Sequence, residues 1–97
     1  TTPELRLSCP DAIKFAVVAH VTEYFRALHS VIDIDGVRVL FDTGWGLVRA
    51  SNTGPVLVMR CEANTAAQLE AIVANLEAAI HSAKVAIAGD SQSGDAS

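Results

Sequence analysis

The stretch "GWGLVRASNTGPVLVMRCEA", residues 44–63, decides the fold, because two strand-like segments flank a loop of turn-forming residues. Gly46–Val48 is short and apolar, and Val56–Ala63 alternates between a fully apolar face and a face that carries charges, as expected of a half-buried strand. Between them, Arg49–Pro55 reads RASNTGP. The pattern therefore predicts a β-hairpin whose loop is unusually polar.

Further strands are predicted on the N-terminal side of this hairpin. Alternating apolar residues predict a strand over Glu4–Cys9, and two short apolar segments predict strands over Val31–Ile34 and Val37–Phe41. Asp35-Gly36 between the last two is a strong signal for a two-residue hairpin turn.

Two helices complete the prediction. Pro10 and Asp11 are expected to open the first helix, and Thr65 with Gln68 forms a capping box for the second. The first apolar stripe, at spacings of three and four, consists of Ile13, Val17, His20, Val21, Tyr24 and Leu28. The second consists of Leu69, Ile72, Val73, Leu76 and Ile80.

The predicted order is β-α-β-β-β-β-α, which indicates an α+β fold. Consecutive hairpins give an antiparallel sheet, and the two amphipathic helices would pack on one face of it. We assign residues 1–84 to one domain, and we expect residues 85–97, which are small and polar from Gly89 onward, to be a disordered tail.

Composition limits the possible functions. The 97 residues are 51% hydrophobic, which is ample for one core, and the net charge of -4 argues against a sequence-independent nucleic-acid binder. We find no apolar run of the roughly 20 residues that a membrane span needs, so no membrane partner is expected. Cys9 and Cys61 are isolated and lie in apolar surroundings, which predicts buried thiols in the reducing cytoplasm.

Several motifs resemble parts of catalytic or metal sites. Asp33–Gly36 lacks the later oxygen ligands of a calcium loop, and His20, His29 and His81 have no metal-site spacing. We expect His20 to be a core histidine and Trp45 to be a packing anchor at the hairpin base. No metal ligand and no catalytic residue is assigned.

Asp42-Thr43-Gly44 matches the tripeptide of aspartic proteases, in which two aspartates, one from each subunit of a dimer, would share a proton. Trp45 follows in place of the usual Ala or Ser, and two amphipathic helices do not suit an almost all-β enzyme. This interpretation is kept as the less favoured alternative.

The loop offers the groups that an anion needs. Arg49 supplies a permanently charged guanidinium that fits phosphate, Ser51 and Thr53 supply hydroxyls, and Asn52 supplies a carboxamide. Gly54 lets backbone N–H groups approach the anion closely. These residues predict phosphate binding without bond breaking, although a plain turn would also fit them.

The segment Ile34–Ala63 resembles the C-terminal domain of the α-D-phosphohexomutases, most closely the bacterial phosphomannomutase/phosphoglucomutase group. The similarity lies in the "DG-hydrophobic" hairpin, the "GW" turn, the "RASNT" loop and "VLVMRCEA", and in the earlier "SCPDAIKFAVV". It covers about residues 4–83, and the "RASNT" loop in this setting is a specific signal.

The resemblance implies a TATA-box-binding-protein-like fold and a place in a larger enzyme. Enzymes of this family have four domains and interconvert hexose 1-phosphates and 6-phosphates through a bisphosphorylated intermediate. A serine of the first domain carries the phosphoryl group, and Mg²⁺ is bound by the second. The fourth domain helps to close the cleft and holds the phosphate that is not transferred, through residues that match Arg49, Ser51, Asn52 and Thr53. Many relatives carry Glu or Thr where this chain has Gly54.

The resemblance also implies the partners. They are glucose or mannose 1- or 6-phosphate, a hexose 1,6-bisphosphate, and the other three domains of a cytoplasmic enzyme of carbohydrate metabolism. Since the serine, metal and sugar loops of the family are missing from these 97 residues, we expect an excised C-terminal domain that is inactive alone and binds no cofactor itself. The alternative is a stand-alone, non-catalytic phosphate-binding or interaction module.

Overall fold

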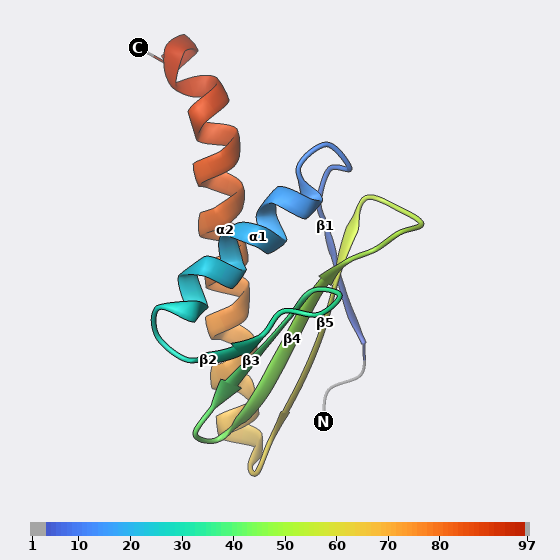
Figure 1. The fold of residues 1–97 in the computed structure, drawn as a ribbon, viewed down its shortest axis with the longest axis vertical. Helices are drawn as coiled ribbons and strands as arrows, with labels where there is room; N and C mark the ends of the chain where they lie inside the picture. The colour runs from blue at the N-terminus through green and yellow to red at the C-terminus, as the bar shows by residue number, and fades with distance from the viewer. Residues whose placement is uncertain (1–3, 97) are drawn as a thin grey trace.

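The computed structural model describes the backbone of residues 4–96 and the side chains of residues 4–88. The elements follow one another as β1 (Leu5–Ser8), α1 (Lys14–Arg26), β2 (Ser30–Ile32), β3 (Val37–Phe41), β4 (Gly44–Ala50), β5 (Val56–Ala63) and α2 (Ala66–Ala96). The predicted β-α-β-β-β-β-α order is confirmed (Figure 1).

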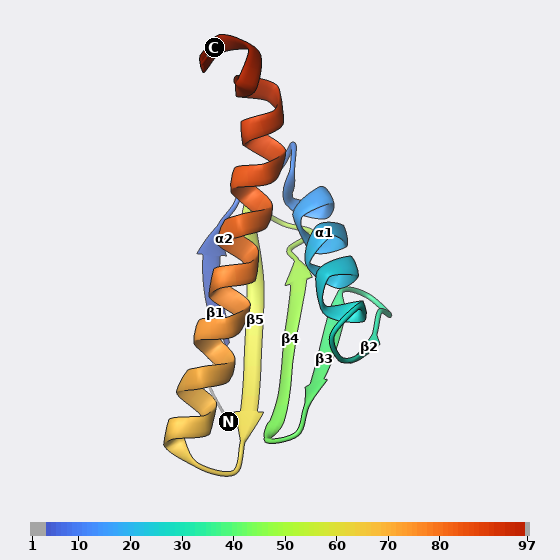
Figure 2. The ribbon, with the colours of Figure 1, turned by 90° about the vertical axis from the view of Figure 1, so that its left-hand side faces the viewer.

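The strands form one five-stranded sheet in the order β1-β5-β4-β3-β2, and every neighbouring pair is antiparallel. The β4–β5 pair is the longest ladder, with a register from Gly44 opposite Ala63 to Ala50 opposite Leu57. Both helices lie on the same face of the sheet, as Figure 2 shows. The predicted antiparallel α+β architecture is therefore confirmed.

The core lies between this face and the helices. In β5, Leu57, Met59 and Cys61 face the helices and are fully buried, which confirms the apolar face read from the sequence. In α2, Leu76 packs directly over Gly46 of β4, where an added Cβ would collide with the Leu76 side chain. The missing side chain at Gly46 thus lets α2 approach the sheet closely.

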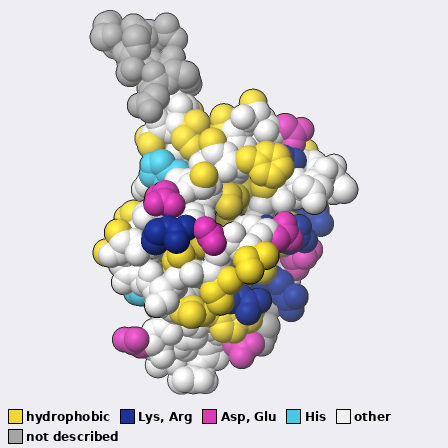
Figure 3. Space-filling view, in the orientation of Figure 1, with side chains coloured by type: hydrophobic (Ala, Val, Ile, Leu, Met, Phe, Trp, Pro, Cys, Tyr) yellow, Lys and Arg dark blue, Asp and Glu magenta, His cyan; other side chains and the backbone are white. Residues whose placement is uncertain are grey.

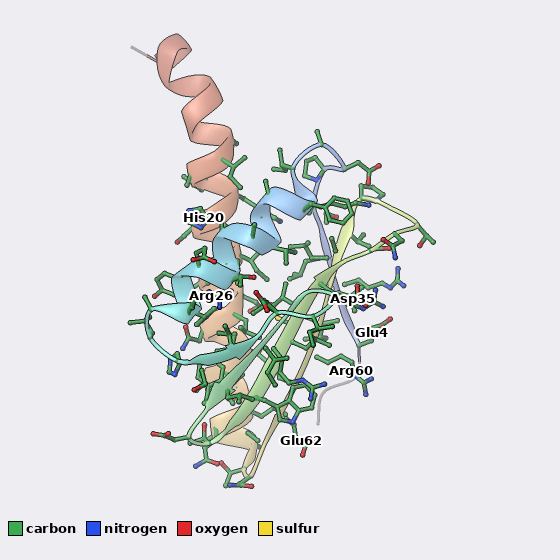
Figure 4. All side chains as sticks on the ribbon, in the orientation of Figure 1. Glu4, His20, Arg26, Asp35, Arg60 and Glu62 are labelled. Atoms are coloured by element: carbon green, nitrogen blue, oxygen red, sulfur yellow. The ribbon has the colours of Figure 1, made fainter. Side chains whose placement is uncertain are left out.

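The opposite face of the sheet carries no helix. Figure 4 shows Arg60 and Glu62 projecting from β5 on this open side. Trp45, expected to be a packing anchor, is half-buried and stacks with the Arg38 guanidinium, whose Cζ lies 4.7 Å from the ring centroid. Trp45 therefore packs through a cation–π contact on the open face and not within the main core.

The start of α1 differs from the prediction. Pro10 and Asp11 lie in a turn before the helix, in which the Pro10 carbonyl accepts hydrogen bonds from the N–H groups of Ile13 and Lys14, each at 3.0 Å. The Asp11 carboxylate instead pairs with the Lys14 ammonium at 2.9 Å. Proline and aspartate signal a helix start in general, but here they position the turn that leads into it.

The buried side of α1 is also narrower than predicted. Val17, Val21 and Phe25 are fully buried, whereas His20 is exposed and Tyr24 is 49% exposed. The prediction of a core histidine at position 20 is therefore wrong. His20 and Tyr24 occupy the flank of the helix, where they line a shallow groove with α2, so a helical spacing alone did not separate the buried face from its edge.

The start of α2 confirms one half of the predicted capping box. The Gln68 N–H donates to the Thr65 hydroxyl at 3.1 Å, which satisfies a backbone donor of the first turn. The return bond from the Gln68 side chain is not formed, because its Oε1 is buried without a partner among the described residues. Thr65 therefore caps the helix alone.

The helix α2 continues past the expected domain boundary at residue 84. It extends to Ala96, and Ile87 still packs against the core. The side chains of residues 89–97, most of the predicted tail, lie outside the described residues.

Contrary to the sequence analysis, Ala66–Ala88 has the length and the mean hydropathy, 1.3, of a helix that could cross a membrane. Its apolar residues are explained by the fold, since one side packs on the sheet and much of the other side is alanine, a strong helix former.

Candidate anion-binding site

The β4–β5 loop lies where three segments distant in sequence meet. The Cys9 N–H, just after β1, donates to the Pro55 carbonyl at 2.8 Å, and the Lys14 side chain reaches the same loop from the start of α1. Figure 1 shows the loop beside the β1–α1 connection, at one end of the sheet. The loop is therefore fixed at both of its sides and not only by its flanking strands.

The four predicted phosphate-binding residues occupy different positions in this loop. Arg49 lies within β4, opposite Val58, and is half-buried on the open face of the sheet. Ser51 is buried, with 4% of its surface exposed, whereas Asn52 and Thr53 are exposed at the tip. The structure thus brings the four residues into one short segment but turns Ser51 inward.

Ser51 shapes the loop from within. Its hydroxyl oxygen accepts a hydrogen bond from the Thr53 N–H at 3.1 Å and lies 3.2 Å from the Thr53 hydroxyl. Its own N–H donates to the Val56 carbonyl at 3.0 Å, which closes the base of the loop. The backbone N–H groups of Asn52 and Gly54, by contrast, have no acceptor among the residues that the structure describes. These two donors are available to a ligand.

Arg49 also has no carboxylate partner in the described part of the chain. Arg6 and Arg26 do form ion pairs, with Glu4 at 3.7 Å and with Asp33 at 2.7 Å. A guanidinium without an ion-pair partner, in the same short segment as two N–H groups without an acceptor, is suited to receive an anion. The loop therefore has local positive character in a chain whose net charge is -4.

The β2–β3 turn supports Arg49. The predicted two-residue turn is wrong, because β2 ends at Ile32, which pairs with Arg38, and residues 33–36 form a longer connection. Asp35 and Gly36 within it both have positive φ, 54° and 102°. A Cβ placed on Gly36 would lie 2.5 Å from the Val48 carbonyl oxygen and 2.6 Å from the Arg49 Cβ. Glycine at this position thus serves two purposes, because it permits the turn and leaves room for the Arg49 side chain.

A cavity of about 340 Å³ adjoins the loop, between α1 and the β2–β3 turn. Phe15, Thr22, Arg26, Asp33, Asp35 and Asn52 are among its lining residues. Its charged side chains are mostly acidic, because Glu23, Asp33 and Asp35 line it together with one basic residue, Arg26. Arg26 pairs with Glu23 and Asp33, and its hydrogen bond holds the pKa of the Asp33 carboxyl below its usual value. Acidic and basic side chains are likewise interspersed over the face seen in Figure 3. The candidate anion site is therefore confined to the loop.

Lys14 is a residue contacting the loop that the sequence analysis missed. Its side chain is only 7% exposed, and its ammonium donates to the Ser51 carbonyl at 2.5 Å and to the Gly54 carbonyl at 2.9 Å. A signal was present, because Lys14 stands three residues before Val17 on the buried side of α1. A lysine at a buried helical position needs polar partners, and here the loop provides them.

The other motifs are not assembled into sites. No group of three or more His, Cys, Asp or Glu side chains that could hold a metal ion occurs within the described portion of the chain. Asp42 is exposed in the short β3–β4 turn, at the end of β4 away from the loop. Cys9 and Cys61 are buried, as predicted, and burial raises the pKa of Cys61 to about 11.

Comparison with protein families gives a match over residues 4–79 to the model described as "Phosphoglucomutase/phosphomannomutase, C-terminal domain". The chain is 47% identical over 73 residues to a phosphomannomutase/phosphoglucomutase of Pseudomonas syringae, which covers 74% of this chain and 16% of that protein. It is 42% identical over 85 residues to a phosphoglucomutase of Neisseria gonorrhoeae, which covers 84% of this chain and 18% of that protein.

A solved structure is similar as well. A phosphoglucomutase/phosphomannomutase family protein from Burkholderia thailandensis superposes with a TM-score of 0.60 at 36% identity, over 86% of this chain and 17% of that one. The chain thus spans about a sixth of the length of the relatives that it matches.

Proposed function

Since this chain belongs to the phosphoglucomutase/phosphomannomutase family and matches its C-terminal domain, we propose that the β4–β5 loop binds the phosphate group of a hexose phosphate. The observation that carries this proposal is the unpaired Arg49 beside the free N–H groups of Asn52 and Gly54. In the intact mutase, this phosphate is the one that is not being transferred, and its capture helps to close the active-site cleft.

The chemistry follows from the donors. The Arg49 guanidinium can donate two parallel hydrogen bonds to phosphate oxygens, and the Asn52 and Thr53 side chains can add neutral donors at the exposed tip. Ser51 contributes by holding the turn, since its hydroxyl already accepts from the Thr53 N–H. These groups bind and orient without breaking a bond. Binding energy from a non-reacting phosphate can still be used to align the reacting end of the sugar.

Catalysis requires parts that lie outside this domain. We propose that the full mutase is a cytoplasmic enzyme interconverting glucose or mannose 1-phosphate and 6-phosphate through a hexose 1,6-bisphosphate. Its other three domains would supply the phosphoryl-carrying serine and the Mg²⁺ site. The described residues contain no acidic cluster suited to Mg²⁺, so no step of the reaction is assigned to them and the isolated chain should be inactive.

The test is a titration of backbone amide shifts with glucose 1-phosphate at constant ionic strength. We expect the amides of residues 49–54 to move with a Kd of about 1 mM, because one phosphate held by one arginine supplies about 4 kcal/mol. Arg49→Ala should weaken binding at least about tenfold, as expected for the loss of a charge-assisted contact.

Arg60→Ala is the matched control, because Arg60 is an exposed arginine of β5 and its loss should change the affinity less than about twofold. Unphosphorylated glucose should cause no shift. Equal behaviour of the two arginine variants, or no shift with glucose 1-phosphate, would remove the loop as a phosphate site.

A further inference from the structure

Beneath the β4–β5 loop, the Lys14 ammonium uses all three of its donors on this part of the molecule. The Ser51 carbonyl lies at 2.5 Å, the Gly54 carbonyl at 2.9 Å and the Asp11 carboxylate at 2.9 Å. We propose that Lys14 is the positioning residue of the phosphate-binding loop, and that its buried ammonium sets the backbone conformation in which the loop receives phosphate. This proposal rests on the phosphate-binding function proposed above.

The two carbonyls mark the ends of the exposed tip. The carbonyl groups of Ser51 and Gly54 both point toward the Lys14 Nζ atom. Asn52 and Thr53, which lie between them, must therefore project away from Lys14. The loop is clamped by a side chain of another element, α1, 40 residues away from Gly54 in the sequence. A single buried group therefore determines where the tip lies relative to the helix.

The peptide unit between Ser51 and Asn52 determines where the Asn52 N–H points. The carbonyl of Ser51 and the N–H of Asn52 belong to the same peptide unit, and in a trans peptide these two groups point in opposite directions. The structure contains no cis peptide bond within the described residues. Because Lys14 attracts the Ser51 carbonyl, the Asn52 N–H is directed outward, toward the side from which a ligand approaches. Lys14 thus orients a phosphate donor that it does not touch.

The charge of Lys14 acts in the same direction. A buried ammonium is compensated only by the groups around it, and here these are two carbonyl dipoles and one carboxylate, Asp11, which is 67% exposed. Water screens the exposed carboxylate more than the buried ammonium. The ammonium therefore adds positive potential beneath the tip, and phosphate bound above it benefits without direct contact.

The alternative is that Lys14 only stabilises the fold. Lys84 provides a matched comparison, because its ammonium donates to the Ser8 carbonyl at 2.6 Å and ties α2 to β1. It is also a lysine–carbonyl contact between two elements, but it is exposed and does not involve the β4–β5 loop. A purely structural lysine would lower the free energy of unfolding when replaced, but it would leave the affinity of each folded molecule unchanged.

The experiment compares Lys14→Met with Lys84→Met in the full 97-residue chain. Glucose 1-phosphate is titrated at constant ionic strength, and the Kd is taken from the resonances of the folded state, so partial unfolding does not affect it. We expect Lys14→Met to weaken binding about tenfold, as expected for misdirected donors and a lost charge. Lys84→Met should stay within about twofold. In the free protein, the Asn52 amide resonance should move in the Lys14 variant and not in the Lys84 variant.

A second variant covers the case in which Lys14→Met does not fold. Lys14→Gln keeps one hydrogen-bond donor group but loses the charge and is too short to reach both carbonyls, and it should also bind more weakly. Unchanged affinity in either folded Lys14 variant overturns the proposal, and so does the absence of any folded population in both. Arg49→Ala separates the two hypotheses: if it weakens binding while Lys14→Met leaves the affinity unchanged, the loop binds phosphate but Lys14 does not position it.

Discussion

Replacing Gly36 by alanine should disturb the fold and the site together. The residue has φ of 102°, a conformation that an L side chain adopts only with strain of about 1–3 kcal/mol. The new Cβ would also lie 2.5 Å from the Val48 carbonyl oxygen and 2.6 Å from the Arg49 Cβ. Forcing these atoms apart should cost a further ~1–3 kcal/mol. We therefore expect Gly36→Ala to lower the free energy of unfolding by at least about 2 kcal/mol.

The assay is urea denaturation of Gly36→Ala, followed by circular dichroism, with Gly54→Ala as the control. Gly54 has no heavy atom within 4 Å of an added Cβ and no positive φ. Its replacement should change stability between zero and about 1 kcal/mol in the stabilising direction, because alanine restricts the unfolded chain.

A loss of 2 kcal/mol corresponds to a drop in Tm of at least about 8 °C for a domain of this size. Equal unfolding midpoints for the two variants would refute the steric argument. Gly36→Ala should also weaken glucose 1-phosphate binding, because the displaced atom is the Arg49 Cβ.

Further predictions concern the core, the loop, the catalytic context and pH. Leu76→Ala, at a fully buried position over Gly46, should cost about 2–5 kcal/mol in urea denaturation, and a cost below about 1 would contradict the close packing described. Ser51→Ala should cost about 1 kcal/mol, because it removes the acceptor of the Thr53 N–H, and no change would mean that this hydrogen bond is not formed in solution. In an intact mutase carrying this domain, Arg49→Ala should lower kcat/KM about ten- to two-hundredfold, and full activity would exclude Arg49 from the site. Burial raises the pKa of Cys61 to about 11, whereas the thiol of the unfolded chain ionises at about 8.5. The stability that the neutral thiol contributes should therefore be present below about pH 8.5 and be lost as the pH rises toward about 11. Cys61→Val should reduce this decline, measured as the free energy of unfolding between about pH 8.5 and about pH 11.

The order of elements could be predicted because it depends on local signals. Two of these signals reflect how a single element buries its apolar side: the alternation in Val56–Ala63 and the spacing of Ile72, Leu76 and Ile80. Asp35-Gly36 marks the reversal of the chain between two strands. The width of the buried side of α1, in contrast, does not depend on local signals alone. Whether His20 is buried depends on how closely α2 lies beside α1, and the spacing within α1 contains no information on that distance.

The same reasoning explains what was missed at the site. The sequence indicated the residues of the loop, because turn formers and hydrogen-bond donors stand together there. Lys14 is 35 residues from Arg49, and only the packing of α1 on the sheet brings its ammonium under the loop. The inward turn of Ser51 likewise depends on contacts made after the strands have paired. Long-range contacts therefore account for the part of the site that sequence reasoning could not reach.

The arrangement of the sheet bears on how the domain behaves in solution. The two longest strands, β4 and β5, are interior, and the edges are β1 with four residues and β2 with three. An exposed strand edge is a template for pairing with another chain, and short edges offer little length for it. The domain should therefore resist aggregation through edge-to-edge association of sheets, even at the high protein concentration used to record amide shifts.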